Sequence, residues 1–228
     1  NKITSNMNID IEEISEFFSS INKFQHIKGQ DKLPYASEAN FEIEKIIKLI
    51  NSKAKQKIID LKQIYKNTDF YNWLSNDFIE DINLTCRYIE KNFLSNNFFS
   101  NTKKIISQSD VGFHNMLIKN NQLFFIDFEY AGWDNSLKFI SDWILQPDSF
   151  FPLKKSLDFF DPLAKAINEK NNWKDRIKPY LLLYRIRWAL IIANKLYKKK
   201  DPTKEDYNVT KLIDYFQESK NYIDCIFS

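Results

Sequence analysis

The sequence predicts a mostly helical domain that carries one small β-hairpin near its middle. Of its 228 residues, 43% are hydrophobic and 16% are aromatic, which is enough to build one sizeable core. Apolar residues recur at the three- and four-residue spacing of helices on both sides of the middle of the chain. Between these segments, two short apolar runs flank a polar stretch that is typical of a turn.

The leading helices are predicted within residues 1–100. Apolar positions that share one helical face indicate helices over Asp10–Phe24, Phe41–Tyr65 and Phe78–Phe93. The segment Gly29–Pro34 is expected to be a loop, because glycine and proline both interrupt regular structure.

The middle region, residues 104–130, is predicted to hold the hairpin. Lys104–Ser107 is a short segment with a β-branched pair, and Met116–Ile118 and Leu123–Ile126 are the two strands of the hairpin. Two consecutive asparagines lie between these strands, and Asn tolerates the left-handed backbone of tight turns. The turn can contain two or three residues, so the register of the hairpin stays open.

Residues 131–228 are predicted to return to helices. The expected helices cover Leu153–Glu169, Lys174–Tyr197 and Lys204–Lys220. The three regions together are expected to form one helical domain.

Composition excludes several classes of protein. The net charge of +3, from 33 basic and 30 acidic residues, argues against a dedicated nucleic-acid or acidic-membrane binder. No apolar run is long enough to span a bilayer, since the most apolar candidate, Tyr180–Tyr197, contains Arg185 and Arg187. Cys86 and Cys225 suggest no disulfide framework, so we expect reduced thiols in a cytoplasmic protein without membrane insertion.

Polar residues are predicted to meet at the open end of the hairpin. With a two-residue turn Asn115 lies opposite Ile126, and with a three-residue turn it lies opposite Asp127. In both registers Asn115 and Asp127 are neighbours, and their oxygens suit a hard cation such as Mg²⁺. Asp110 lies on the loop that enters the first strand, where Gly112 permits a tight path.

This combination of residues is typical of phosphoryl transferases. In such enzymes one carboxylate accepts the proton of an attacking hydroxyl, while an Asn and a second Asp hold Mg²⁺. Asp110 is followed five residues later by Asn115, and then by a strand and Asp127, which is the kinase spacing. The alternative is that Asp110 and Asn115 only form a turn and that Asp127 only ends a strand.

The segment Asp110–Leu117, followed by Ile126–Tyr130, resembles the aminoglycoside phosphotransferase and choline kinase superfamily. The Ile-Asp-Phe-Glu-Tyr run is especially similar to choline and ethanolamine kinases. Gly132–Asn135 and the Asp142-Trp143 pair resemble the next characteristic stretch, so the similarity covers residues 106–147. The resemblance implies the C-terminal lobe of a protein-kinase-like fold of the aminoglycoside phosphotransferase type. It also implies a kinase for the hydroxyl of a small metabolite such as choline, an amino alcohol, a sugar or an aminoglycoside.

The resemblance further implies a role for each matching residue. Asp110 would be the catalytic base or would orient the hydroxyl. Asn115 and Asp127 would be the Mg²⁺ ligands and would bind ATP through the metal, and Asp142 would brace the catalytic loop. The expected cofactors are therefore Mg²⁺ and ATP, and the expected partners are a nucleotide and a small hydroxylated substrate.

Gln108 is a departure from the family pattern, which usually has His two residues before the catalytic Asp. That His generally packs and forms hydrogen bonds, so the change does not by itself remove catalysis. His114, next to Asn115, is interpreted as a structural residue of the loop.

A second departure concerns the N-terminal lobe, whose Gly-rich loop, strand Lys and helix Glu grip ATP in kinases. The only glycines are Gly29, Gly112 and Gly132, and the first residue is Asn1 rather than Met. We therefore expect that the N-terminal lobe is absent from these residues, and that they fold as the C-terminal lobe alone without turning over substrate. The alternative is a kinase-derived binding or regulatory module that has lost catalysis. A protein kinase ranks last, because the stretch up to Asp142 leaves little room for an activation segment.

Overall fold

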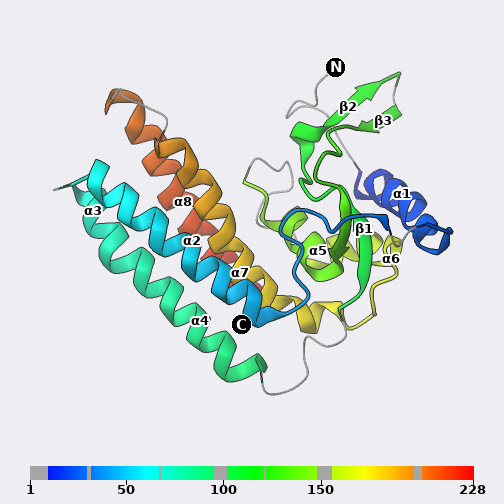
Figure 1. Cartoon of the computed structure of the whole chain (residues 1–228), viewed down its shortest axis with the longest axis horizontal. Coiled ribbons are helices and arrows are strands. Elements are labelled where there is room, and N and C mark those ends of the chain that lie inside the picture. The colour runs from blue at the N-terminus through cyan, green and yellow to red at the C-terminus, as the bar shows by residue number, and fades with distance from the viewer. Residues whose placement is uncertain are drawn as a thin grey trace. The chain divides into compact units, whose positions relative to one another are not determined.

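The computed structural model describes most of the chain, apart from residues 1–9, 30–31, 67, 95–101, 121, 148–155 and 198–201, and apart from the side chains of residues 202–206. The described residues form two compact units. The first unit draws on residues 1–41 and 101–180, and the second draws on residues 42–100 and 181–228. Figure 1 labels their helices and three of their strands, β1, β2 and β3.

The first unit combines short helices with four strands. Its helices are α1 (Ile11–Asn22), α5 (Ser136–Leu145), α6 (Asp161–Ala166) and the first part of α7 (Trp173–Ala193). Single 3₁₀ turns cover Lys23–His26, Phe113–Asn115 and Leu157–Phe160. Asp10 starts α1 with a side-chain cap to the backbone N–H of Glu12, and Asn135 caps α5 in the same way at Leu137 and Lys138.

Two antiparallel strand pairs lie in the first unit. β1 (Lys104–Ser107) pairs with β4 (Gly132–Asn135), and β2 (Met116–Lys119) pairs with β3 (Gln122–Phe125). The hairpin of β2 and β3 extends away from α5 in Figure 1. Its register joins Lys119 to Gln122, which leaves a two-residue turn, and Asn120 in that turn has a φ of 51°.

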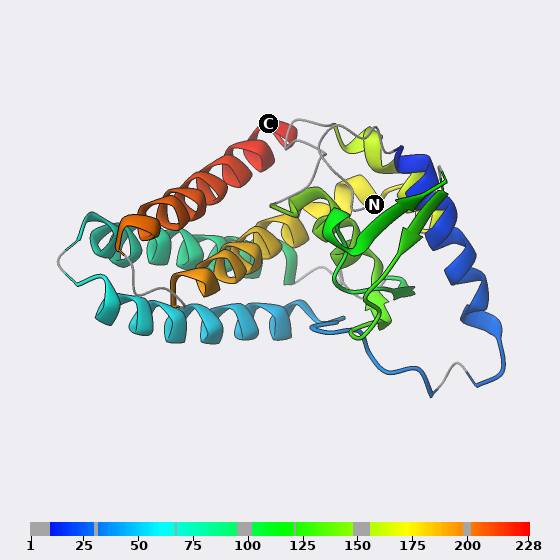
Figure 2. The same ribbon diagram turned by 90° about the horizontal axis from the view of Figure 1, so that it is seen from above.

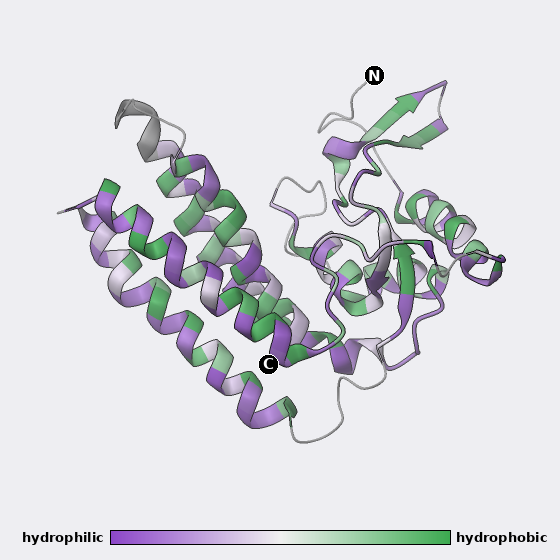
Figure 3. Ribbon diagram, viewed as in Figure 1, coloured by the Kyte–Doolittle hydropathy of each residue, from purple (hydrophilic) through white to green (hydrophobic). Residues whose placement is uncertain are grey.

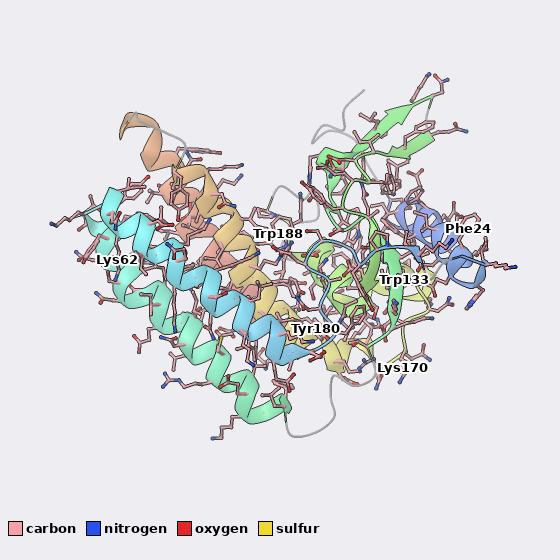
Figure 4. The ribbon with its side chains drawn as sticks, in the orientation of Figure 1. Phe24, Lys62, Trp133, Lys170, Tyr180 and Trp188 are labelled. Atoms are coloured by element: carbon pink, nitrogen blue, oxygen red, sulfur yellow. The ribbon has the colours of Figure 1, made fainter. Side chains whose placement is uncertain are left out.

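Aromatic side chains form much of the core of the first unit. Phe18 of α1 makes edge contacts with Phe139 and Trp143 of α5. Phe17, next to it, stacks on Phe125 of β3 with ring centroids 3.9 Å apart. In Figure 4, the labelled Trp133 lies on β4 and Tyr180 lies on α7. Burial raises the pKa of Tyr180 to about 12, and its hydroxyl accepts a hydrogen bond from Asn135.

The second unit consists of helices. They are α2 (Ile43–Ile64), α3 (Asp69–Trp73), a π-helical turn (Leu74–Phe78), α4 (Ile79–Phe93), the rest of α7, a 3₁₀ turn (Asn194–Tyr197) and α8 (Pro202–Ile226). Figures 1 and 2 show α2, α4, α7 and α8 of this unit running side by side. Figure 3 shows hydrophobic residues alternating with hydrophilic ones along α2 and α4, as expected for helices with one buried face.

The predicted fold class is confirmed, because the described residues are mostly helical with a small hairpin in the middle of the sequence. The helices predicted over Asp10–Phe24, Phe41–Tyr65 and Phe78–Phe93 match α1, α2 and α4 within a few residues. The first residues of the predicted Leu153–Glu169 helix lie outside the described residues, and the described remainder ends at Ala166. The prediction for Lys204–Lys220 was too short at its end, since α8 continues to Ile226.

Three elements were missed in the sequence. They are α3 with its π-helical turn, strand β4 and helix α5. Every residue of β4 and of α5 is buried. β4 has only four residues and shows no strand-like alternation, and the helical spacing of Leu137, Ile140 and Ile144 in α5 extends over only ten residues. Within the described residues, none of the helices combines the length and the apolar character needed to cross a membrane.

Candidate active site

Asp110 lies on a loop of residues 107–115 that joins β1 to β2, here called the Asp110 loop. The backbone N–H of Ser109 donates to the Oγ of Ser107 at 3.0 Å, and the Oγ of Ser109 donates to the backbone oxygen of Ser37, also at 3.0 Å. Ser109 has a φ of 70°, and this strained backbone is stabilised by the hydrogen bonds on either side. The loop is therefore anchored immediately before Asp110.

Asn115 is bound directly to Asp110. Its Nδ2 donates to the backbone oxygen of Asp110 at 2.9 Å and to the carboxylate Oδ2 at 3.2 Å. The backbone N–H of Asn115 donates to Gly112, which closes the turn between the two residues. Because Nδ2 makes both of these bonds, the amide oxygen Oδ1 is the atom of this side chain that is available to a cation.

Asp127 comes directly after Ile126, the residue that pairs with Asn115 across the hairpin. The backbone oxygen of Asn115 accepts from the N–H of Ile126 at 2.9 Å, so the two-residue turn holds and Asp127 is one residue further along. Asp127 has a φ of 64° and an exposed side chain. The three residues predicted from the sequence therefore gather at the open end of the hairpin, Asp110 and Asn115 by direct hydrogen bonds and Asp127 by strand pairing.

Gln108 links the Asp110 loop to this second strand. Its buried Nε2 donates to the backbone oxygen of Ile126 and, at 3.3 Å, to that of Asp127. The sequence showed Gln108 only as a departure from a family pattern. In the structure its amide bridges the segments that carry Asp110 and Asp127, a role that its position in the sequence did not reveal.

A buried ionic network lies behind the Asp110 loop. The ammonium of Lys138 donates to Oδ2 of Asp134 at 2.9 Å and to Oδ2 of Asp142 at 3.0 Å, and none of the three side chains is more than 1% exposed. Asp134 also accepts from the Oγ of Ser107 at 2.7 Å. The network thus continues from Asp134 through Ser107 to the backbone of Ser109.

The donor set at the open end of the hairpin fits a Mg²⁺ ion. Asn115 offers an amide oxygen and Asp127 offers an exposed carboxylate, both of which are hard oxygen ligands. Among the described residues, no group of three or more His, Cys, Asp or Glu side chains is placed to hold a metal. Mg²⁺ tolerates such a sparse site, because it usually binds through one or two protein groups and fills its shell with phosphate oxygens and water.

Negative charge accumulates around this end of the first unit. A hydrogen bond with Glu129, followed by the charges of Glu129, Asp127 and Asp110, raises the pKa of the exposed Tyr130 hydroxyl above its ordinary value. A divalent cation would relieve the repulsion among these carboxylates.

Comparison with solved structures defines the fold. No family model and no curated protein sequence matches the chain. The structure is similar to choline kinase from Cryptosporidium parvum (TM-score 0.52, 15% identity), Plasmodium vivax ethanolamine kinase (0.51, 12%) and the ADP-bound aminoglycoside phosphotransferase APH(2'')-Ib (0.53, 18%). The matches cover 94%, 92% and 96% of this chain, and 65%, 60% and 70% of those chains, respectively.

The described residues therefore have the helical C-terminal-lobe fold of kinase-like phosphotransferases. The fold is similar to that of these choline kinase, ethanolamine kinase and aminoglycoside phosphotransferase structures, as the sequence resemblance implied. At identities of 12–18% the likeness defines the fold and not the substrate.

Proposed function

We propose that the protein is an ATP- and Mg²⁺-dependent phosphotransferase that acts on the hydroxyl of a small metabolite, such as choline, an amino alcohol, a sugar or an aminoglycoside. One observation carries this proposal. Asn115 donates two hydrogen bonds to Asp110, and its backbone pairs with Ile126, the residue directly before Asp127. The residues of the kinase spacing lie on adjoining segments of the fold, which supports the catalytic and metal-binding roles proposed for them.

Asp110 is the proposed catalytic residue. In the reaction, the oxygen of the acceptor hydroxyl forms a bond to the γ-phosphorus of ATP, and the bond from that phosphorus to the β,γ-bridging oxygen breaks. ADP leaves with the electron pair, and the hydroxyl proton passes to the carboxylate of Asp110. Its half-exposed carboxylate, held by Asn115, is accessible to a hydroxyl from solvent.

Asn115 and Asp127 are the proposed Mg²⁺ ligands, through the amide oxygen and the carboxylate. When bound, the metal neutralises charge on the phosphates of ATP. The protein side chains would orient the metal, and Gln108 would keep the two ligand segments together. We also propose that the protein is located in the cytoplasm, where thiols such as those of Cys86 and Cys225 are kept reduced.

A kinase-derived binding or regulatory module is the second candidate, and it is motivated by the missing glycines and by Gln108 in place of the family's His. The hydrogen bonds of Gln108 favour the active phosphotransferase, because the substituted residue joins the catalytic loop to the metal strand.

The direct test is Asp110→Ala in the complete gene product that contains these residues. The assay measures ADP release and product formation with Mg-ATP and a panel of choline, ethanolamine, sugars and aminoglycosides. We expect kcat to fall roughly 10²- to 10⁴-fold, the usual contribution of a general base, while the unfolding midpoint stays close to that of the wild type. The matched control is Asp175→Ala, an exposed aspartate of the same unit that should retain full turnover. Unchanged turnover in Asp110→Ala would contradict the assignment.

A further inference from the structure

His114 stands next to the proposed catalytic carboxylate, and the proposed function gives it no role. Its Nε2 lies 3.3 Å from Oδ2 of Asp110, which is four residues earlier in the sequence. The two side chains are 46% and 42% exposed. A side-chain contact so exposed to water contributes little to stability. Stability therefore does not explain this contact.

Gln146 determines how the imidazole of His114 presents its proton. Gln146 is a buried residue directly after α5, and its Nε2 lies 3.0 Å from Nδ1 of His114. An amide nitrogen is a donor only, so Nδ1 has to accept this hydrogen bond. In the neutral ring the proton then resides on Nε2, the nitrogen that faces Asp110.

Gly112 makes room for this arrangement. A Cβ atom at residue 112 would lie 2.5 Å from Nε2 of Gln146 and 2.9 Å from Cε1 of His114. Gly112 also has a φ of 152°, which side-chain-bearing residues rarely adopt. The glycine thus lets the Gln146 amide lie against the Asp110 loop at the place where His114 can reach it.

We propose that Gln146 and His114 form a positioning relay for Asp110. Gln146 donates to Nδ1 of His114, and the Nε2–H of His114 donates to Oδ2 of Asp110. Asn115 donates to the same oxygen at 3.2 Å, so two donors on different sides restrict rotation of the carboxylate about its Cβ–Cγ bond. The relay keeps the carboxylate in the orientation that receives the hydroxyl proton, and it rests on the proposed phosphotransferase function.

The relay predicts a defect in turnover rather than in ATP binding. A carboxylate that can rotate is misplaced in part of the population, which reduces kcat, whereas the metal ligands Asn115 and Asp127 remain in place. We expect His114→Leu to lower kcat roughly 10- to 100-fold, with little change in the KM for Mg-ATP or in the unfolding midpoint. Gln146→Leu should lower kcat less, because the ring is still present but its tautomer is no longer selected.

His114→Gln provides the conservative rescue. The amide nitrogen of Gln reaches about as far as Nε2 of His and can donate to Asp110, so this variant should recover most of the kcat that His114→Leu loses. His26→Gln, at an exposed histidine of the same unit, is the matched control and should behave as the wild type. Equal loss in His114→Leu and His114→Gln, or no loss in either, would overturn the relay.

The tautomer of His114 tests the relay without any reference to activity. Nitrogen–proton correlation spectra of the complete protein are recorded at a pH about two units above the ordinary imidazole pKa of about 6.5. Ring signals that disappear in His114→Gln belong to His114. A proton on Nε2 in the wild type, and a mixture of tautomers in Gln146→Leu, support the relay; a proton on Nδ1 overturns it. If the wild type transfers no phosphate to any acceptor, the proposed function fails, and this measurement decides the contact alone.

Discussion

The two units of the protein each contain a buried ionic network, and the two networks are built differently. In the first unit, Lys138 lies between Asp134 and Asp142, and all three side chains are almost completely excluded from water. In the second unit, Arg185 of α7 pairs with Asp81 of α4, which also binds Lys220 of α8. Asp81 is 12% exposed and Lys220 is 43% exposed, so this second network reaches the solvent.

The networks also differ in how completely their atoms are paired. The Lys138 ammonium donates to both carboxylates, and Asp134 accepts a further bond from Ser107 of the Asp110 loop. Arg185 uses Nη2 for Asp81 and Thr85, while its buried Nε and Nη1 have no hydrogen-bond partner among the described residues. The first network therefore supports the candidate active site, whereas the second joins helices at some cost in unpaired polar atoms.

The largest effect is expected when the first network loses its cation. Lys138→Met removes the cation that two fully buried carboxylates share, and breaking a buried pair in this way costs about 3–5 kcal/mol. Urea unfolding measures the loss of stability. Lys170→Met, at an exposed position of the first unit, is the control and should change stability by less than about 0.5 kcal/mol. A Lys138→Met variant as stable as the wild type would contradict the role of this network in supporting the Asp110 loop.

A smaller effect is expected from Arg185→Met in the second unit. Asp81 keeps Lys220 and access to water, and the two unpaired N–H groups of Arg185 are removed. Loss of the packing of Arg185 against Phe216, 4.7 Å from guanidinium to ring, acts in the opposite direction. We expect a loss of about 1–2 kcal/mol, and almost none for Arg87→Met at an exposed site on α4. A loss as large as that of Lys138→Met would remove the distinction between the two networks.

The smallest expected effect is a loss of stability at acidic pH, which arises from Asp81. Burial opposes ionisation of this carboxyl, but Arg185 and Lys220 outweigh burial and lower its pKa below the ordinary value. A lowered pKa in the folded state gives stability that is present above the unfolded-state pKa of about 3.9 and is lost as pH falls through the folded-state pKa. The unfolding temperature of the wild type should therefore fall below about pH 4, and Asp81→Asn should show a shallower fall. Parallel curves for the two proteins would contradict the pairing.

The sequence predicted those helices in which the spacing of apolar residues corresponds to one buried face. Helices α1, α2 and α4 each have one buried and one exposed face, so their spacing was informative. Helix α5 is buried on all sides, and its charged residues Lys138 and Asp142 are buried with it. Its apolar residues Leu137, Ile140 and Ile144 follow helical spacing, but the helix has no exposed face and its sequence is short. The same burial conceals from the sequence that Lys138 and Asp142 form an ionic network.

The candidate site, too, could be predicted from the sequence only in part. Asp110, Asn115 and Asp127 could be proposed from spacing, because a hairpin brings residues close in the sequence to one end. The register could not be decided, since both turn lengths suit the asparagines, and the Ile126 N–H bonded to Asn115 resolves it. Gln146 lies 32 residues beyond His114, and nothing local connects them, so their contact appears only in the folded chain.

Binding of Mn²⁺, a paramagnetic substitute for Mg²⁺, tests the central claim most directly. In the complete protein with ATP, electron paramagnetic resonance measures how much Mn²⁺ is bound. We expect Asp127→Asn and Asn115→Leu each to weaken Mn²⁺ binding by roughly tenfold or more, because each removes one of the few protein ligands, while the exposed-site control Asp175→Asn binds as the wild type does. Wild-type affinity for Mn²⁺ in both ligand variants would contradict the account.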